Sequence, residues 1–106
     1  MYAIFIGKTN SIMEVDNCLF EDNYNLGRGG VVLADAVASK FFFVNSIFTS
    51  NYAVLGGVAY AQALSSVSFL LCNFVENFAL IGGVMHVGTD GLSHFEKSIF
   101  TRNSAY

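Results

Sequence analysis

The chain repeats a four-residue pattern, F-x-x-N, four times along its 106 residues. The phenylalanines are 28, 26 and 26 residues apart, and a Gly-Gly pair followed by an apolar segment comes after three of the four copies. Self-similarity at a period of 20–50 residues indicates a repeat architecture. The recurring residues are Phe20, Phe48, Phe74 and Phe100, then Asn23, Asn51, Asn77 and Asn103, then Gly29, Gly30, Gly56, Gly57, Gly82 and Gly83.

Two further columns appear once the repeats are aligned on these phenylalanines. Residues Val15, Phe43, Phe69 and Phe95 stand five positions earlier, and Cys18, Ser46, Cys72 and Ser98 stand two positions earlier. The segment around Phe5 matches that around Met85, which brings the N-terminal part into the same register. We therefore divide the chain into four repeats, approximately 2–28, 29–55, 56–81 and 82–106. The first carries two extra residues, and we assign Arg28 as one of them.

The content of each repeat predicts strands. The period is too short for most two-helix repeats, and no segment shows a sustained 3.6-residue apolar spacing. The second repeat contains three short runs at 31–34, 41–44 and 46–49, which are rich in β-branched and aromatic residues and bounded by Gly, Asn, Asp or Ser. We expect an all-β protein, a right-handed parallel β-helix (β-solenoid) of about four turns with three short strands per turn.

The recurring residues have structural roles in such a coil. Successive turns lie about 4.8 Å apart, so equivalent side chains are stacked directly over one another. The two phenylalanine columns should fill the interior, and the asparagines should pass amide hydrogen bonds from turn to turn. The Gly-Gly pairs should supply a sharp corner and let neighbouring turns approach closely.

These motifs resemble the polymorphic membrane protein (Pmp-type) repeat of chlamydial autotransporters and protist surface proteins. That family is marked by F-x-x-N and by G-G-A-I, and here the second motif reads Gly-Gly-Val in all three copies. The resemblance covers nearly the whole chain. It implies an extracellular or cell-surface β-helix with a role in adhesion or surface structure.

Composition excludes two partner classes. Apolar residues make up 54% of the chain, yet the longest apolar runs are far shorter than the roughly 18 residues of a membrane span. The net charge is −3 without a basic cluster, so nucleic acid is not an expected partner.

The titratable residues predict no catalytic, cofactor-binding or metal site. Cys18 and Cys72 belong to one column but lie two turns apart, roughly 10 Å, which is too far for a disulfide. We interpret both as small inward-facing residues. His86 and His94 would need Asp90 and Glu96 to complete a metal site, and the carboxylates read as solvated turn residues without convergent partners. We therefore expect no enzymatic activity.

Two surface features remain. Tyr24, Tyr52 and Phe78 form an outward aromatic column, which we expect to pack against a loop or a neighbouring protein rather than a carbohydrate. Arg102 stands one turn above Glu76, a spacing that suits an axial ion pair.

No polar cap is evident at either end, so we interpret the chain as a fragment of a longer solenoid. Its expected partners are further turns of the same protein or neighbouring copies at the open ends, and a surface glycan or protein ligand. We favour a non-catalytic structural or adhesive rod. One alternative is a carbohydrate-binding or polysaccharide-degrading β-helix with its active turns outside this segment, and another is a filament subunit formed by end-to-end stacking.

Overall fold

The computed structural model describes residues 3–106, and this part of the chain is all-β, with strands joined by turns and bends. The strands of the first two turns are β1 (Phe5–Ile6), β2 (Ile12–Asp16), β3 (Leu19–Glu21), β4 (Tyr24–Arg28), β5 (Val32–Ala34), β6 (Lys40–Val44), β7 (Ile47–Thr49) and β8 (Tyr52–Leu55). Those of the next two turns are β9 (Ala59–Ala61), β10 (Ser66–Leu70), β11 (Asn73–Val75), β12 (Phe78–Ile81), β13 (Met85–Val87), β14 (Leu92–Glu96), β15 (Ile99–Thr101) and β16 (Ser104–Ala105).

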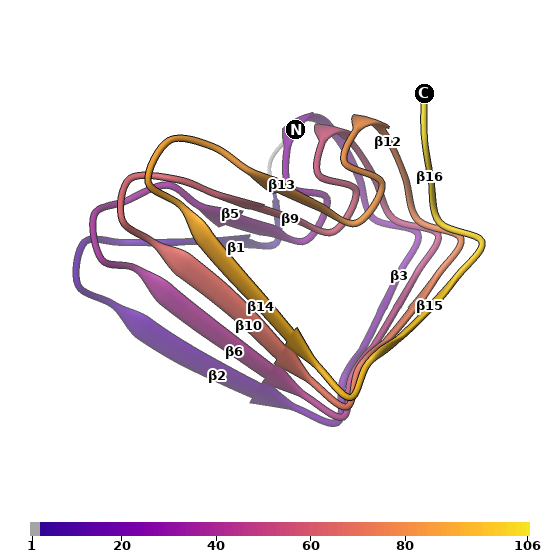
Figure 1. The fold of residues 1–106 in the computed structure, drawn as a ribbon, viewed down its shortest axis with the longest axis horizontal. Coiled ribbons are helices and arrows are strands. Elements are labelled where there is room, and N and C mark those ends of the chain that lie inside the picture. The colour runs from indigo at the N-terminus through magenta and orange to yellow at the C-terminus, as the bar shows by residue number, and fades with distance from the viewer. Residues whose placement is uncertain (1–2) are drawn as a thin grey trace.

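The strands form four parallel sheets, each with one strand from every turn (Figure 1). Sheet A has the order β1-β5-β9-β13, and sheet B has β2-β6-β10-β14. Sheet C has β3-β7-β11-β15, and sheet D has β4-β8-β12-β16. Each strand pairs with its equivalent in the next turn, so the chain is a coil rather than a set of hairpins. The prediction of a parallel β-solenoid of about four turns is confirmed.

Each turn contains four strands, and the prediction of three is wrong. The missed strands are those of sheet D, which follow the F-x-x-N asparagines. In the second turn, a single residue with left-handed backbone, Ser50 (φ 55°), separates the sheet C strand from Asn51, and β8 begins at once. Because neither glycine nor proline marks this corner, the sequence there reads as one continuous turn region.

The two extra residues lie at different places, and only one of them is in the first repeat, where both were predicted. In β4, the pairing with β8 shifts between Asn25 and Arg28, so a bulge accommodates one extra residue there. Arg28 itself pairs with Leu55, so its assignment as the extra residue is wrong. The second extra residue lies in the connection between β5 and β6, which spans 35–39 where the next turn has 62–65.

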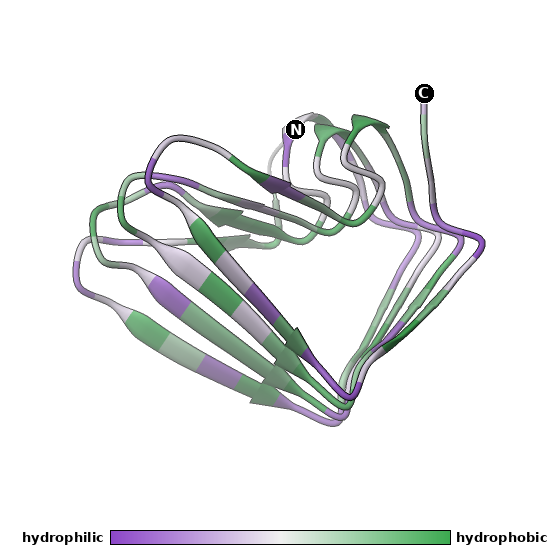
Figure 2. Ribbon diagram, viewed as in Figure 1, coloured by the Kyte–Doolittle hydropathy of each residue, from purple (hydrophilic) through white to green (hydrophobic). Residues whose placement is uncertain are grey.

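The interior is filled by alternate side chains of all four sheets. Along β6 and β10, inward residues are buried and their neighbours are half-buried or exposed, which matches the two-residue period of a strand. Figure 2 shows hydrophobic bands separated by paler or hydrophilic ones along β10 and β14, whereas β6 is hydrophobic from Phe41 to Val44. In the two middle turns the largest fully buried side chains are phenylalanines, namely Phe43, Phe48, Phe69 and Phe74. Within residues 3–106 there is no helix long and apolar enough to cross a membrane.

Candidate functional site

The four F-x-x-N asparagines form a continuous hydrogen-bonded ladder at the corner between sheets C and D. In the second turn, Asn51 donates from its backbone nitrogen (3.0 Å) and from Nδ2 (2.9 Å) to Oδ1 of Asn77 in the next turn. Asn77 Nδ2 also donates to the carbonyl oxygen of Phe48 in the turn before (2.9 Å). Both asparagines are fully buried. In the middle turns, every polar atom of these two buried asparagine side chains therefore has a hydrogen-bond partner, as is usual for buried polar groups.

The bonds between the asparagines have a direction, because each asparagine donates to the side-chain oxygen of the asparagine in the next turn. Asn23 donates to Asn51 from both nitrogens, and Asn77 donates in the same way to Asn103. Among the described residues, nothing donates to Oδ1 of Asn23, and the backbone N–H of Asn103 has no acceptor. The first turn therefore presents a free acceptor, and the last turn presents a free donor.

The phenylalanines form two stacked columns that meet edge to face. In the sheet C column, the rings of Phe48 and Phe74 are 5.1 Å apart at an interplanar angle of 8°. In the sheet B column, Phe43 and Phe69 are 5.3 Å apart at 15°. Between the columns, Phe69 and Phe74 lie 4.9 Å apart at 83°. Both geometries are favoured by aromatic quadrupoles. The same columns hold Phe20 and Phe100 in sheet C, and Val15 and Phe95 in sheet B.

The two glycines of each pair have separate roles at the corner between sheets D and A. The first glycine has a left-handed backbone, with φ of 72°, 70° and 69° in Gly29, Gly56 and Gly82. The second allows close approach between turns, because a Cβ on Gly57 would overlap the carbonyl oxygen of Gly83. A Cβ on Gly30 would likewise meet the next turn. Both positions therefore require glycine, for different reasons.

The other corners use left-handed residues that are not glycine. One such residue recurs between sheets B and C, and another between sheets C and D, with φ between 49° and 57°. Side chains are tolerated there because the corners are exposed to solvent. The residues are Asn17, Asn45, Leu71 and Lys97 at the first corner, and Asp22, Ser50, Glu76 and Arg102 at the second.

The two cysteines occupy equivalent positions but different environments. Cys72 is buried, and burial raises the pKa of its thiol, although the thiol contacts backbone groups of Ser46 and Leu70 that lower the pKa. Its backbone N–H donates to Ser98 Oγ at 3.2 Å, and Cys18 donates in the same way to Ser46 Oγ. Both cysteines are free. Cys18 is exposed on the first turn, although its thiol contacts the Asp16 carbonyl oxygen just as that of Cys72 contacts Leu70.

The outer face of sheet D carries the predicted aromatic column. The rings of Tyr24 and Tyr52 are stacked at 5.0 Å, and those of Tyr52 and Phe78 at 5.3 Å. The column ends at Ser104, which pairs with Phe78. Half of Tyr24 is exposed. The column is a stack of three rings that is exposed at Tyr24 and half-buried at Tyr52 and Phe78.

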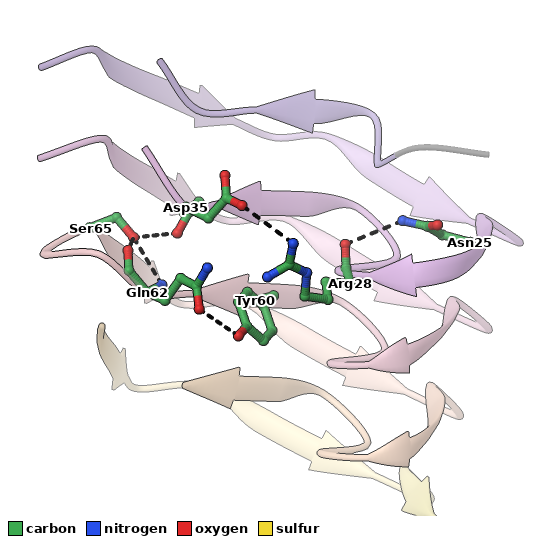
Figure 3. Close-up of polar contacts among 7 residues, drawn as sticks. Asn25, Arg28, Asp35, Tyr60, Gln62 and Ser65 are labelled. Carbon is green, nitrogen blue, oxygen red and sulfur yellow. Dashed lines mark hydrogen bonds and ion pairs between the residues drawn. The ribbon is translucent and has the colours of Figure 1, made fainter. Parts of the chain in front are cut away.

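The outer face of sheet A carries a cluster that sequence reasoning missed (Figure 3). The guanidinium carbon of Arg28 lies 5.1 Å from the ring centroid of Tyr60, a cation–π distance, and Arg28 Nη2 lies 3.7 Å from Oδ2 of Asp35. The Tyr60 hydroxyl donates to Gln62 Oε1 at 2.8 Å, and the ring stacks on His86 at 5.1 Å. Tyr60 is buried, so the cluster stabilises the face by packing. The sequence carried one signal of this cluster, because Tyr60 and His86 occupy equivalent positions in consecutive repeats.

The bulge in β4 has its own support. The buried side chain of Asn25 donates from Nδ2 to the carbonyl oxygens of Arg28 (3.2 Å) and Gly29 (3.0 Å). Its Oδ1 accepts from the backbone N–H of Gly27 at 2.8 Å. Asn25 thus bonds backbone groups around the bulge and holds the segment that leads to Arg28, where pairing with β8 resumes.

The outer face of sheet B is hollowed near the first turn. A shallow hollow of about 500 Å³ is lined by Glu14, Val15, Asp16, Phe42 and Val44. A smaller hollow continues along the same face past Phe42 to His94 and Glu96. The exposed part of this surface combines an aromatic ring with carboxylates and an imidazole.

The other candidates remain apart or solvated. His86 lies in sheet A and His94 in sheet B, on different strands. Among residues 3–106, no group of three or more His, Cys, Asp or Glu side chains could hold a metal ion. The predicted axial pair is present, with Arg102 Nε 3.4 Å from Glu76 Oε2, but both side chains are largely exposed. Such a pair contributes little to stability.

Searches of protein-family models, curated proteins and solved structures found no match to this chain. No relative therefore supplies a residue role. The likeness to the Pmp-type repeat stays a prediction.

Proposed function

We propose that this chain is a structural rod segment of an extracellular or cell-surface β-helix, without catalytic activity, whose outer faces contact partners. The observation that carries the proposal is the ladder system. The asparagine and sheet C phenylalanine columns run through all four turns, the Gly-Gly corner recurs three times, and these recurring residues are used for contacts between turns. The surface residues vary from turn to turn, as expected where a scaffold displays contacts.

The experiment that tests this function has two arms on the full-length protein. Antibodies against this segment should label intact cells, since the rod is displayed outside. A screen of polysaccharides for lyase and hydrolase activity should show no turnover. Labelling only after permeabilisation would refute the location, and robust turnover would refute the structural role.

A second candidate, carbohydrate binding, is favoured by one observation. The sheet B hollow is lined by Phe42 of the second turn together with Glu14 and Asp16 of the first turn. An aromatic face can pack against the apolar face of a sugar ring, and carboxylates accept hydrogen bonds from its hydroxyls. On a glycan array, Phe42→Ala should then lose binding, whereas Tyr24→Ala, an aromatic truncation on sheet D, should retain it. Equal binding by both variants would exclude the hollow as the site.

A further inference from the structure

A shallow groove on the outer face of sheet B crosses all four turns. Its larger hollow is lined by residues of the first two turns, and its smaller hollow continues to the fourth turn. The two hollows share Phe42 and Val44, so they form one continuous surface. The face is lateral, so further turns at either end of the coil would extend the solenoid beyond the groove without covering it.

One column of this groove has carboxylates at both ends and aliphatic side chains between them. Its members, in the order of the turns, are Asp16, Val44, Leu70 and Glu96. The two acids are exposed, and the two aliphatic residues are half-buried. In the neighbouring column, Phe42 is 36% exposed and widens the apolar floor. The groove thus offers an apolar floor with a negative charge at each end.

The carboxylates of this column have no cationic partner within residues 3–106. The two ion pairs in this part of the chain are those of Arg28 and Arg102, and neither includes a sheet B residue. Lys40 on β6 and Lys97 after β14 line neither hollow. A partner that covers the acids would therefore have to supply the positive charge, because a carboxylate that loses water without a counter-charge is destabilised.

The spacing of the two acids matches an extended peptide with a defined pattern. Asp16 and Glu96 are three turns apart, which is about 14 Å at about 4.8 Å per turn. An extended chain advances about 3.3–3.4 Å per residue, so its residues i and i+4 are separated by about the same distance. The side chains of residues i, i+2 and i+4 lie on one face, because side chains alternate along a strand. Basic residues at i and i+4 with an apolar residue at i+2 would therefore fit the column.

A neutral sugar chain fits this column less well than such a peptide. Sugar hydroxyls can hydrogen-bond to the carboxylates, but they leave both charges uncompensated. The peptide places a cation over each acid and an aliphatic side chain over the apolar centre. The order of charges and apolar residues along the column thus favours a protein partner.

We propose that the sheet B groove binds an extended basic segment of a partner protein, with basic side chains at i and i+4 against the two acids and an apolar side chain at i+2 over Val44 and Leu70. This partner rests on the rod function proposed above, in which the outer faces contact other molecules. Because the contact depends on exposed charges, it weakens as the salt concentration rises.

Fluorescence polarisation of short labelled peptides measures binding to the intact chain. The probe is Lys-Thr-Leu-Thr-Lys with blocked termini. Its matched control, Lys-Thr-Leu-Lys-Thr, has the same composition but places the second basic side chain on the opposite face of the extended peptide. The probe should bind about fivefold to tenfold more tightly than the control.

The charge reversal Asp16→Lys tests the groove itself. It should weaken binding of the probe about tenfold, and it should favour Glu-Thr-Leu-Thr-Lys, whose carboxylate pairs with the introduced ammonium. The matched control is Asp22→Lys, the same charge change on an exposed corner of the same turn outside the groove. This variant should bind the probe like the unmodified chain. Circular dichroism confirms that each variant keeps its strands.

Three results would overturn the proposal: no binding of the probe, equal binding of the probe and its control, or a probe affinity that Asp16→Lys leaves unchanged. Binding of a neutral polysaccharide by a chain that binds neither lysine peptide would overturn it as well, and would support the sugar candidate. None of these results affects the surface display or the absence of turnover, which test the rod itself.

Discussion

Removing one rung from the middle of the asparagine ladder should destabilise the fold far more than removing one at its end. Asn77→Ala deletes two donated and two accepted side-chain hydrogen bonds in a fully buried site. Two donors of Asn51, its backbone N–H and one Nδ2 hydrogen, lose the acceptor that they share, and the Phe48 carbonyl oxygen loses one of its donors. Each unsatisfied buried group costs about 1–3 kcal/mol, so the two unsatisfied donors predict a loss of about 2–6 kcal/mol. This is a large fraction of a typical unfolding free energy of about 5–15 kcal/mol.

The matched control is Asn23→Ala, the same substitution at the first turn. Asn23 donates one side-chain hydrogen bond to Asn51 Oδ1, and that oxygen still accepts from the backbone N–H of residue 23 in the variant. No buried group loses its only partner, so the expected cost is about 1 kcal/mol. The position is also partly exposed, so water can replace the lost bond.

Urea unfolding followed by far-ultraviolet circular dichroism measures both free energies. The slope of the free energy with urea should be unchanged, because neither substitution alters the surface exposed on unfolding by much. Equal costs for Asn77→Ala and Asn23→Ala would refute the reasoning, since the ladder would then contribute no more in the buried turns than at its exposed end.

Three further predictions test other columns. Phe74→Ala should lower the free energy of unfolding by about 3–5 kcal/mol and Phe100→Ala by clearly less, because Phe100 is half exposed; equal losses in urea unfolding would contradict this. Gly57→Ala should lower the melting temperature sharply, since its Cβ would overlap a carbonyl oxygen of the next turn; an unchanged value in a calorimetric scan would contradict it. At pH 8, a thiol reagent should label Cys18 quickly and Cys72 only on unfolding, because burial shields the Cys72 thiol and raises its pKa; equal rates would contradict it.

The coil was predictable because stacking requires the same residue in the same place in every turn. Phe48 and Phe74 recur in sequence since they touch in space, and Asn51 recurs with Asn77 for the same reason. In a parallel coil, residues that recur at the sequence period are therefore the ones that contact each other in neighbouring turns.

The features that sequence reasoning missed have no residue type that recurs from turn to turn. The sheet D strands follow a corner made by a single left-handed residue, and residues as different as Ser50, Glu76 and Arg102 occupy it. Because this corner is exposed, the backbone conformation recurs without any recurring side chain. The contact between Arg28 and Tyr60 depends on a bulge that occurs in one turn only, so it does not recur and gives no signal in the repeat pattern.

Residues that recognise a partner should therefore be sought at the positions of the solenoid that differ from turn to turn. In the middle turns, a recurring residue such as Asn77 is bonded to its neighbours in the column and has no free side-chain group for a partner. The outward positions change along each sheet: one sheet B column reads Glu14, Phe42, Ser68 and His94. Such a column gives each turn a different chemistry at a fixed spacing of about 4.8 Å. The core thus sets where surface groups stand along the rod, and the irregular outer columns determine what they can bind.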